Sequence, residues 1–265
     1  MKKSLPFEFL FQITSLIIAI ILVHLIYITV IRPNADAILE ERAARTAAGE
    51  VIEEERSFYV VLRDYEQESC FILMLWALAI MGYKIKNSAK ERSLLEGELI
   101  KLAEGISILP EDTREYSRPL QALNPDSRSQ LLPRALLAAL QRFASTRNVQ
   151  DVSEAVRTIC ESESDRLDSE LSMVRYIAWA IPSIGFIGTV RGIGDALGQA
   201  YKAVEGDIAG VTASLGVAFN STFVALVISI IIMFLMHQLQ LVQERLVLDT
   251  QYYCDQNLIR HMQVR

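Results

Sequence analysis

The residues that build most small sites and scaffolds are scarce in this 265-residue chain. The three cysteines, Cys70, Cys160 and Cys254, form no CxxC pair and have no metal-ligand spacing, so we expect ordinary thiols and no metal site. With only 12 glycines and 7 prolines, the chain is neither collagen-like nor of low complexity. Its net charge of −6 argues against a nucleic-acid binder, which normally carries a basic stripe.

Charge is absent from several long apolar stretches, although 22% of all residues are charged and the mean hydropathy is +0.26. Residues 9–31 hold no formal charge and can cross a hydrocarbon core of roughly 30 Å. We interpret them as a retained transmembrane helix and not as a signal peptide, because no cleavage site follows. Residues 172–197 and 208–236 are also long enough to span. Residues 70–83 are a shorter candidate, for which a buried or interfacial helix is the alternative.

These stretches predict an all-α polytopic membrane protein with four transmembrane helices and long helices that extend into the cytoplasm. Segment 32–69 holds five arginines against ten acidic residues, whereas lysines and arginines precede the first span and follow the second. By the positive-inside rule, both termini are then cytoplasmic. The expected segments, in order, are a first transmembrane helix (1–33), an acidic extracytoplasmic helical segment (34–69), a second transmembrane helix (70–86), a cytoplasmic helical domain (87–171), two pore-lining transmembrane helices (172–236) and a cytoplasmic helical tail (237–265).

Apolar spacing within the charged segments predicts further helices. We expect helices at 94–100, 131–143 and 148–171, with a loop or helix-breaking elbow at 105–130 because that stretch holds three prolines. The tail should continue the fourth span. The acidic face of segment 34–67 is most simply a solvated surface.

Glycines gather in the third span, which reads IPSIGFIGTVRGIGDALG from residue 181 to 198. Gly185, Gly188 and Gly192 share one helix face with Thr189, and such stripes let helices approach closely in lipid. Pro182 can kink the helix just before the stripe. Helix packing alone is the simpler explanation for these glycines.

Hydroxyl and amide groups face this stripe from the fourth span. Thr189 places a hydroxyl at mid-span, and two helices with such faces can line a narrow polar passage. The alternative is that each hydroxyl bonds to a carbonyl of its own helix. The candidate pathway residues are Thr189, Ser214, Asn220, Ser221 and Thr222.

Titratable groups are absent from mid-depth in the third and fourth spans, although proton carriers normally need one there. Asp195 lies four residues after Arg191 near the outer end and predicts an interfacial ion pair. His24 and His237 lie near span ends, and we interpret them as structural. Any proton-carrying group must therefore come from a partner.

The run from Ile184 to Ile193 resembles the signature of the MotA/TolQ/ExbB proton-channel subunits, in which G-L-L-G-T-V-x-G-I opens the inner pore helix. Residues 216–230 resemble the second pore helix of that family, with Ala225 and Leu226 on its A-I pair. Ala218 falls on the family's pore threonine. Ser221 or Ser214, one turn on or one turn back, could substitute for that threonine.

This resemblance implies a proton-conducting subunit of an inner-membrane ion-driven motor, such as a flagellar stator, which converts proton motive force into mechanical work. It implies a homopentamer around a dimer of a single-span MotB/ExbD/TolR-like partner that carries a membrane aspartate. Thr189 would face that aspartate. No cofactor is expected apart from the translocated H⁺, and lipid is the other expected partner.

Two other classes compete with this hypothesis. A structural or scaffolding membrane protein would use the glycines only for packing. An enzyme is not expected, because we find no nucleophile–base pair and no metal cluster, and the glycine-rich run follows no predicted strand.

Overall fold

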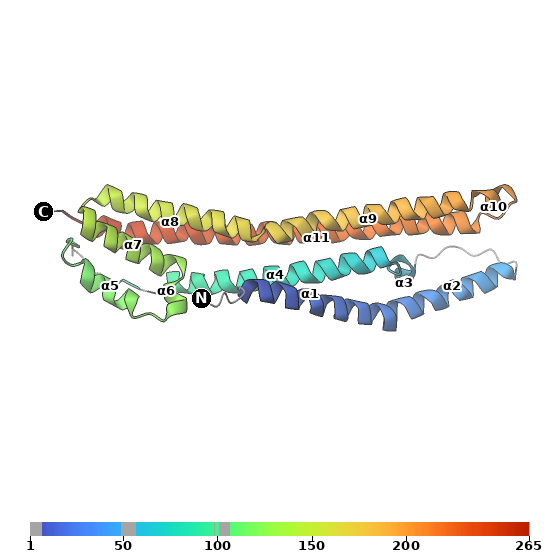
Figure 1. Ribbon diagram of the computed structural model, residues 1–265, viewed down its shortest axis with the longest axis horizontal. Helices are drawn as coiled ribbons and strands as arrows, with labels where there is room; N and C mark the ends of the chain where they lie inside the picture. The colour runs from blue at the N-terminus through green and yellow to red at the C-terminus, as the bar shows by residue number, and fades with distance from the viewer. Residues whose placement is uncertain (1–6, 49–56, 98, 101–106, 265) are drawn as a thin grey trace, which may run out of the picture. The chain divides into compact units, whose positions relative to one another are not determined.

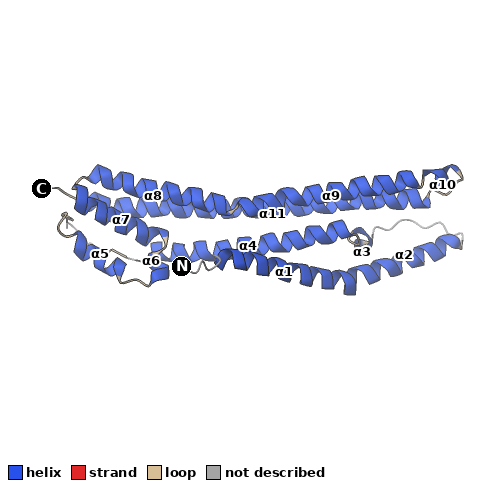
Figure 2. Ribbon diagram, viewed as in Figure 1, coloured by secondary structure: helices blue, strands red, loops and turns tan. Residues whose placement is uncertain are grey.

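Helices make up almost all of the computed structural model, which describes residues 7–48, 57–97, 99–100 and 107–264. Figure 2 shows no strand among these residues, where an isolated parallel bridge joins Ile108 to Met262. Long apolar segments favour helices because a helix satisfies its own backbone hydrogen bonds. The all-α prediction is confirmed.

Four helical stretches are long and apolar enough to cross a membrane, which confirms the predicted number of spans. They are Glu8–Arg45, Tyr65–Leu95, Val149–Gly198 and Ala209–His261. The short apolar stretch 70–83 lies inside a helix of 31 residues, α4 (Tyr65–Leu95). A span needs about 20 residues, so α4 has the length for one.

The chain divides into two compact units, the first of which comprises residues 1–81 and 173–236. In this unit the indole Nε1 of Trp76 on α4 donates to the Gln12 carbonyl of α1 at 2.9 Å. Figure 1 shows α9 and α11 side by side. The elements of this first unit are α1 (Phe7–Ile26), the π-helical η1 (Tyr27–Ile31), α2 (Arg32–Ala47), α3 (Phe58–Val61), the start of α4, α9 (Ser172–Gly198), α10 (Ala200–Val204) and the first half of α11 (Ala209–Asn257).

The second unit comprises residues 82–172 and 237–265 and is built around α7 and α8. The apolar face of α7 is buried, from Leu131 to Phe143. Arg147 ends α7 in a left-handed conformation with φ 53°, and the Asn148 side chain then caps α8 by accepting from the Gln150 N–H at 2.9 Å. Its elements are the end of α4, α5 (Thr113–Gln121), α6 (Pro125–Arg128), α7 (Leu131–Thr146), α8 (Val149–Glu170), the end of α11 and the 3₁₀ turn η2 (Ile259–His261).

The predicted elbow at 105–130 is wrong for about half of its length, because α5 and α6 occupy that part. Asn124 caps α6 by accepting from the Ser127 N–H at 2.8 Å, and Pro125 follows at the first helical position, where a missing N–H costs nothing. The predicted helix at 94–100 is also wrong beyond Leu95, where α4 ends. The predicted helices at 131–143 and 148–171 are confirmed, and α11 continues through the tail as expected.

The acidic segment after the first span was expected to be helical, and part of it is described by the structure. Helix α2 follows η1 directly and confirms that a helix extends the first span. The expectation for residues 49–56 lies outside the described residues.

Two of the cysteines are buried in the core of the second unit. Burial raises the pKa of the Cys160 thiol to about 11 and that of Cys254 to about 12. Both thiols therefore stay protonated and unreactive near neutral pH, because the thiolate is the nucleophile.

A buried carboxylate, Glu163 of α8, joins two helices of this unit. Arg134 of α7 donates to it at 2.5 Å, and Arg166 of α8 forms a second ion pair with it. Burial by itself would raise the pKa of Glu163, but the hydrogen bonds and charges of the two arginines outweigh burial and hold the pKa below its usual value. Glu163 is therefore ionised at neutral pH and ties α8 to α7.

Candidate functional site

The glycine stripe of α9 lies directly against α11. A methyl group at Gly185 would come within 2.5 Å of the Ala225 Cβ, and one at Gly192 within 2.7 Å of the Ala218 nitrogen. A methyl group at Gly188 would overlap the Ser221 side chain. All three glycines are buried, so the helices approach at distances that no larger residue permits.

Hydroxyl groups bridge the two helices beside this stripe. The Thr189 hydroxyl donates to the Ala218 carbonyl at 3.0 Å and is also hydrogen-bonded to the Thr222 hydroxyl. Thr222 reaches the Gly185 carbonyl at 3.0 Å, and Ser221 reaches the same carbonyl at 3.3 Å. Thr189 of α9 and Thr222 of α11 thus form one polar pair, which we call the threonine pair.

The threonine pair has hydrogen-bonding capacity left over. Each hydroxyl carries one proton and two acceptor lone pairs. The two protons can make two of these three contacts at a time, so each is used within the cluster, on a backbone carbonyl or on the other hydroxyl. Both side chains are half-buried, so lone pairs remain to accept a hydrogen bond from a donor outside this chain, such as a protonated carboxylic acid.

The other candidate pathway residues lie around the threonine pair in different settings. Ser221 is fully buried against α9, where it fills the space beside Gly188. Ser214 accepts from Gln199 Nε2 at 3.1 Å. Asn220 is half-buried on α11 and has no recorded hydrogen bond to α9 within the described part of the chain. The structure therefore brings Thr222, and not Ser214 or Asn220, against Thr189.

Pro182 lies inside α9, which continues through it as one helix. Because proline has no N–H, it cannot donate to the Ala178 carbonyl four residues earlier. The hydroxyl of Ser229 on α11 donates to this carbonyl instead, at 2.9 Å, and Ser229 is 4% exposed. The proline and the serine are thus coupled across the helix contact.

Replacing Ser229 with alanine should destabilise the α9/α11 contact, because it leaves the Ala178 carbonyl without a donor. A buried unsatisfied group costs about 1–3 kcal/mol. The matched control is Ser183→Ala, since Ser183 donates at 3.1 Å to the Trp179 carbonyl of its own helix. Thermal unfolding of the detergent-solubilised protein should show a lower midpoint for Ser229→Ala alone. Equal midpoints for the two variants would contradict the coupling.

Residues 127–251, which contain all of α9 and most of α11, match the MotA/TolQ/ExbB proton channel family. This region of the chain is therefore similar to that family. The match includes both members of the threonine pair and the whole glycine stripe. No curated protein matches the chain. The matched family is a membrane proton channel family and not a known enzyme family, and the four long apolar helices agree with a membrane protein.

Arg191 follows the family signature and pairs with α4. Its Nε and Nη2 donate to Glu66 at 2.7 and 2.9 Å, whereas the expected partner, Asp195, lies at 4.0 Å. Asp64 adds a contact at 3.9 Å. The Arg191–Asp195 pair is present, but its geometry is much weaker than that of the bidentate pair with Glu66.

Sequence reasoning missed Glu66 and Glu68, which it left among the acidic residues of an exposed segment. Their side chains are only 11% and 7% exposed, so the solvated-surface expectation for segment 34–67 is wrong for Glu66. Glu68 is hydrogen-bonded to His24 and Arg32. The sequence could have indicated this pairing, because both carboxylates directly precede the apolar stretch of the second span, and charged groups next to a span are rarely left unpaired.

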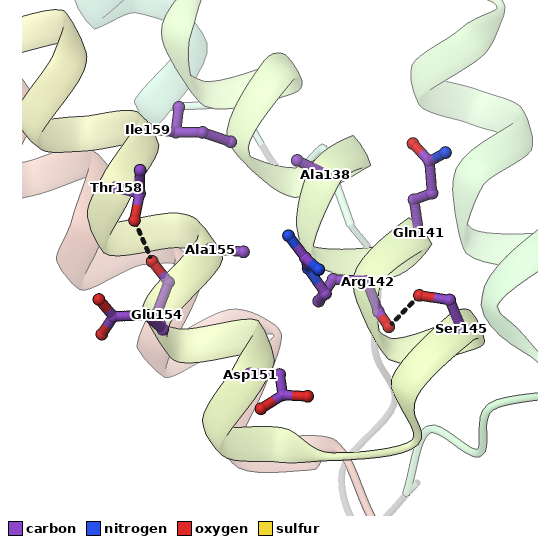
Figure 3. Close-up of a pocket in the computed structure, with 9 residues that line it drawn as sticks. All are labelled: Ala138, Gln141, Arg142, Ser145, Asp151, Glu154, Ala155, Thr158 and Ile159. Atoms are coloured by element: carbon purple, nitrogen blue, oxygen red, sulfur yellow. Dashed lines mark hydrogen bonds between the residues drawn. The ribbon is translucent and has the colours of Figure 1, made fainter.

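A hollow of about 640 Å³ lies between α7 and α8 in the second unit (Figure 3). One cation, Arg142, lines it from α7, and two carboxylates, Asp151 and Glu154, line it from α8. The hydrogen bonds drawn there stay within single helices, from Thr158 to Glu154 and from Ser145 to Arg142. Among the described residues, no group of three or more histidine, cysteine, aspartate or glutamate side chains is placed to hold a metal ion.

Proposed function

We propose that this chain is the proton-conducting subunit of an ion-driven motor complex of the bacterial inner membrane, where it converts proton motive force into mechanical work. The observation that carries the proposal is the threonine pair, which joins α9 to α11 beside a glycine stripe within the family-matched region. Its spare lone pairs suit a protonated carboxyl group. A single-span partner that carries a membrane aspartate would supply that group.

An exposed apolar stripe on α11 supports assembly around such a partner. Phe219, Phe223, Leu226 and Ile230 recur at helical spacing, and each is at least 47% exposed. In the proposed complex, five copies of this chain surround a partner dimer, and the stripe contacts other subunits or lipid. The termini are then cytoplasmic, and H⁺ is the translocated ion.

Replacing Thr189 with valine tests the proposal, because valine keeps the side-chain shape and removes the hydroxyl. A hydrogen bond between neutral groups contributes about 0.5–1.5 kcal/mol, so we expect proton flux to fall roughly two- to tenfold. Flux is measured by fluorescent-dye quenching in liposomes that contain the complex co-purified with its partner. The control is Thr212→Val, because the exposed Thr212 bonds only to carbonyls of its own turn, at 3.2 and 2.9 Å.

Native mass spectrometry of the same preparation tests the assembly. Five copies with a small single-span partner are expected, and Thr189→Val should leave this stoichiometry unchanged. A stable monomer or dimer without a partner would contradict the proposal, as would full flux in Thr189→Val.

A scaffolding function is the second candidate, and one observation favours it. The hydroxyls of Thr189, Ser221, Thr222 and Ser229 all bond to carbonyls of the opposite helix, as packing groups do. A scaffold predicts that Thr189→Val lowers thermal stability while no proton flux is detected in either protein.

A further inference from the structure

A second polar cluster lies in the first unit, at the join between α1, η1 and α2 and the start of α4. His24 Nδ1 is 2.6 Å from Glu68 Oε1, and Arg32 donates to the other carboxylate oxygen, Oε2. The Glu68 side chain is 7% exposed, whereas that of His24 is 52% exposed. A histidine and a carboxylate from two predicted spans are thus in direct contact. Ionisable groups in spans are costly and commonly mark ion or proton pathways.

The charges of this cluster leave the histidine able to change its protonation state. Arg32 alone compensates the charge of Glu68. A neutral His24 can donate Nδ1–H to the carboxylate while Nε2 remains an acceptor. Proton uptake at Nε2 forms an imidazolium and leaves the Nδ1 hydrogen bond in place. The cluster then changes from neutral to a net charge of +1 without losing a contact.

The cation that holds Glu68 is itself fixed in position. The Arg32 guanidinium lies 4.3 Å from the ring centroid of Tyr65 and 5.8 Å from that of Tyr27. These cation–π contacts and the Glu68 hydrogen bond hold the guanidinium, which does not titrate. The mobile proton of the cluster therefore belongs to His24.

A buried hydroxyl beside the cluster is an independent sign of a site. Tyr27 is 1% exposed, and its hydroxyl has no hydrogen-bond partner within the described part of the chain. The Tyr27 ring lies beside the Arg32 guanidinium that is bonded to Glu68. Tyr27 also begins η1, and π-helical insertions are frequent at functional sites.

We propose that His24 and Glu68 form a proton-binding site that takes up one proton from water and releases it again, separately from the threonine pair. The titratable and charged groups around the site are Glu68, Tyr65 and Cys70 from α4, Arg32 from α2, Tyr27 from η1 and Asp64 from the preceding turn. Arg191 of α9 is paired with Glu66 and Asp64. The site does not depend on conduction between α9 and α11.

Nitrogen-15 NMR of the full chain in lipid nanodiscs, with labelled histidine, tests this site. The chain has three histidines, and the signal lost in His24→Gln identifies His24. We expect the His24 signal to change reversibly between the neutral and the protonated form as the pH is lowered. Glu68→Gln should move its midpoint down by about one pH unit, a tenfold loss of proton affinity. Arg32→Gln should move the midpoint up, because it removes a nearby positive charge.

Glu66→Gln is the matched control, since Glu66 lies two residues away on α4 but is paired with Arg191. Its effect on the His24 midpoint should be less than about a third of the Glu68→Gln effect, since it does not contact the ring. Opposite shifts in Glu68→Gln and Arg32→Gln distinguish a proton site from a purely structural contact. If Glu68→Gln does not fold, the upward shift of the His24 midpoint in Arg32→Gln tests the proposal by itself. A His24 signal that does not titrate, or variants that shift it equally or not at all, would overturn the proposal.

Discussion

Replacing Gly192 with alanine should separate α9 from α11, whereas the same change at Gly194 should be harmless. The new methyl group at residue 192 would lie 2.7 Å from the Ala218 nitrogen and from the Ser214 carbonyl oxygen. Both atoms belong to the backbone of α11 and cannot rotate away. At Gly194 the methyl group meets nothing within 4 Å.

The expected loss for Gly192→Ala is about 1–3 kcal/mol, the usual cost of overpacking, and Gly192→Val should be worse. Gly194→Ala should be neutral or stabilising by up to about 1 kcal/mol, because alanine favours the helix. Thermal unfolding in detergent measures both. The Gly192 variants should also lose the threonine pair and therefore any proton flux that depends on it. Unchanged stability in Gly192→Ala would show that α9 and α11 are not in this contact.

Removing the Arg191 side-chain charge should destabilise the first unit far more than removing that of Asp195. Arg191→Gln leaves Glu66, whose side chain is 11% exposed, without its bidentate partner. The Arg191 side chain is 43% exposed, so water can partly replace it, and the loss should be about 1–3 kcal/mol, the cost of leaving a buried acceptor without its donor. Asp195→Asn alters a contact at 4.0 Å on a side chain that is 58% exposed, and should cost less than about 0.5 kcal/mol.

A double-mutant cycle makes this prediction specific. Adding Glu66→Gln to Arg191→Gln removes the uncompensated carboxylate and should restore part of the lost stability. Chemical denaturation of the detergent-solubilised protein supplies the four free energies of unfolding. If Asp195→Asn costs as much as Arg191→Gln, the pair expected from sequence spacing is the important one and Glu66 is secondary.

The helix contact could be predicted from sequence because it depends on spacing within one helix. Gly185, Gly188 and Gly192 lie on one face wherever α9 packs, and their lack of side chains already indicates close approach. The partner of Thr189 was harder to identify, since choosing among Ser214, Ser221 and Thr222 requires the register of α11 against α9. The coupling of Ser229 to the Ala178 carbonyl needs the same register.

Other parts of the site depend on contacts that no local pattern encodes. Glu66 and Arg191 are 125 residues apart in the sequence. Asp195 lies only four residues after Arg191, at helical spacing, and is therefore the partner that the sequence suggests. The helix at 113–121 was missed because Pro119 was taken as a breaker, although it lies in the last turn of α5. Glu66 and Glu68, in the first turn of α4, follow other acidic residues in the sequence, and no local pattern indicates that they are buried.

The glycine stripe also has a mechanical consequence. Two helices that approach this closely at three glycines cannot slide or rotate past each other without a clash, and hydroxyl groups form hydrogen bonds across the same contact. The α9/α11 pair should therefore move as one rigid body. Any displacement during a working cycle must occur where this pair contacts other helices or other subunits, and not between α9 and α11.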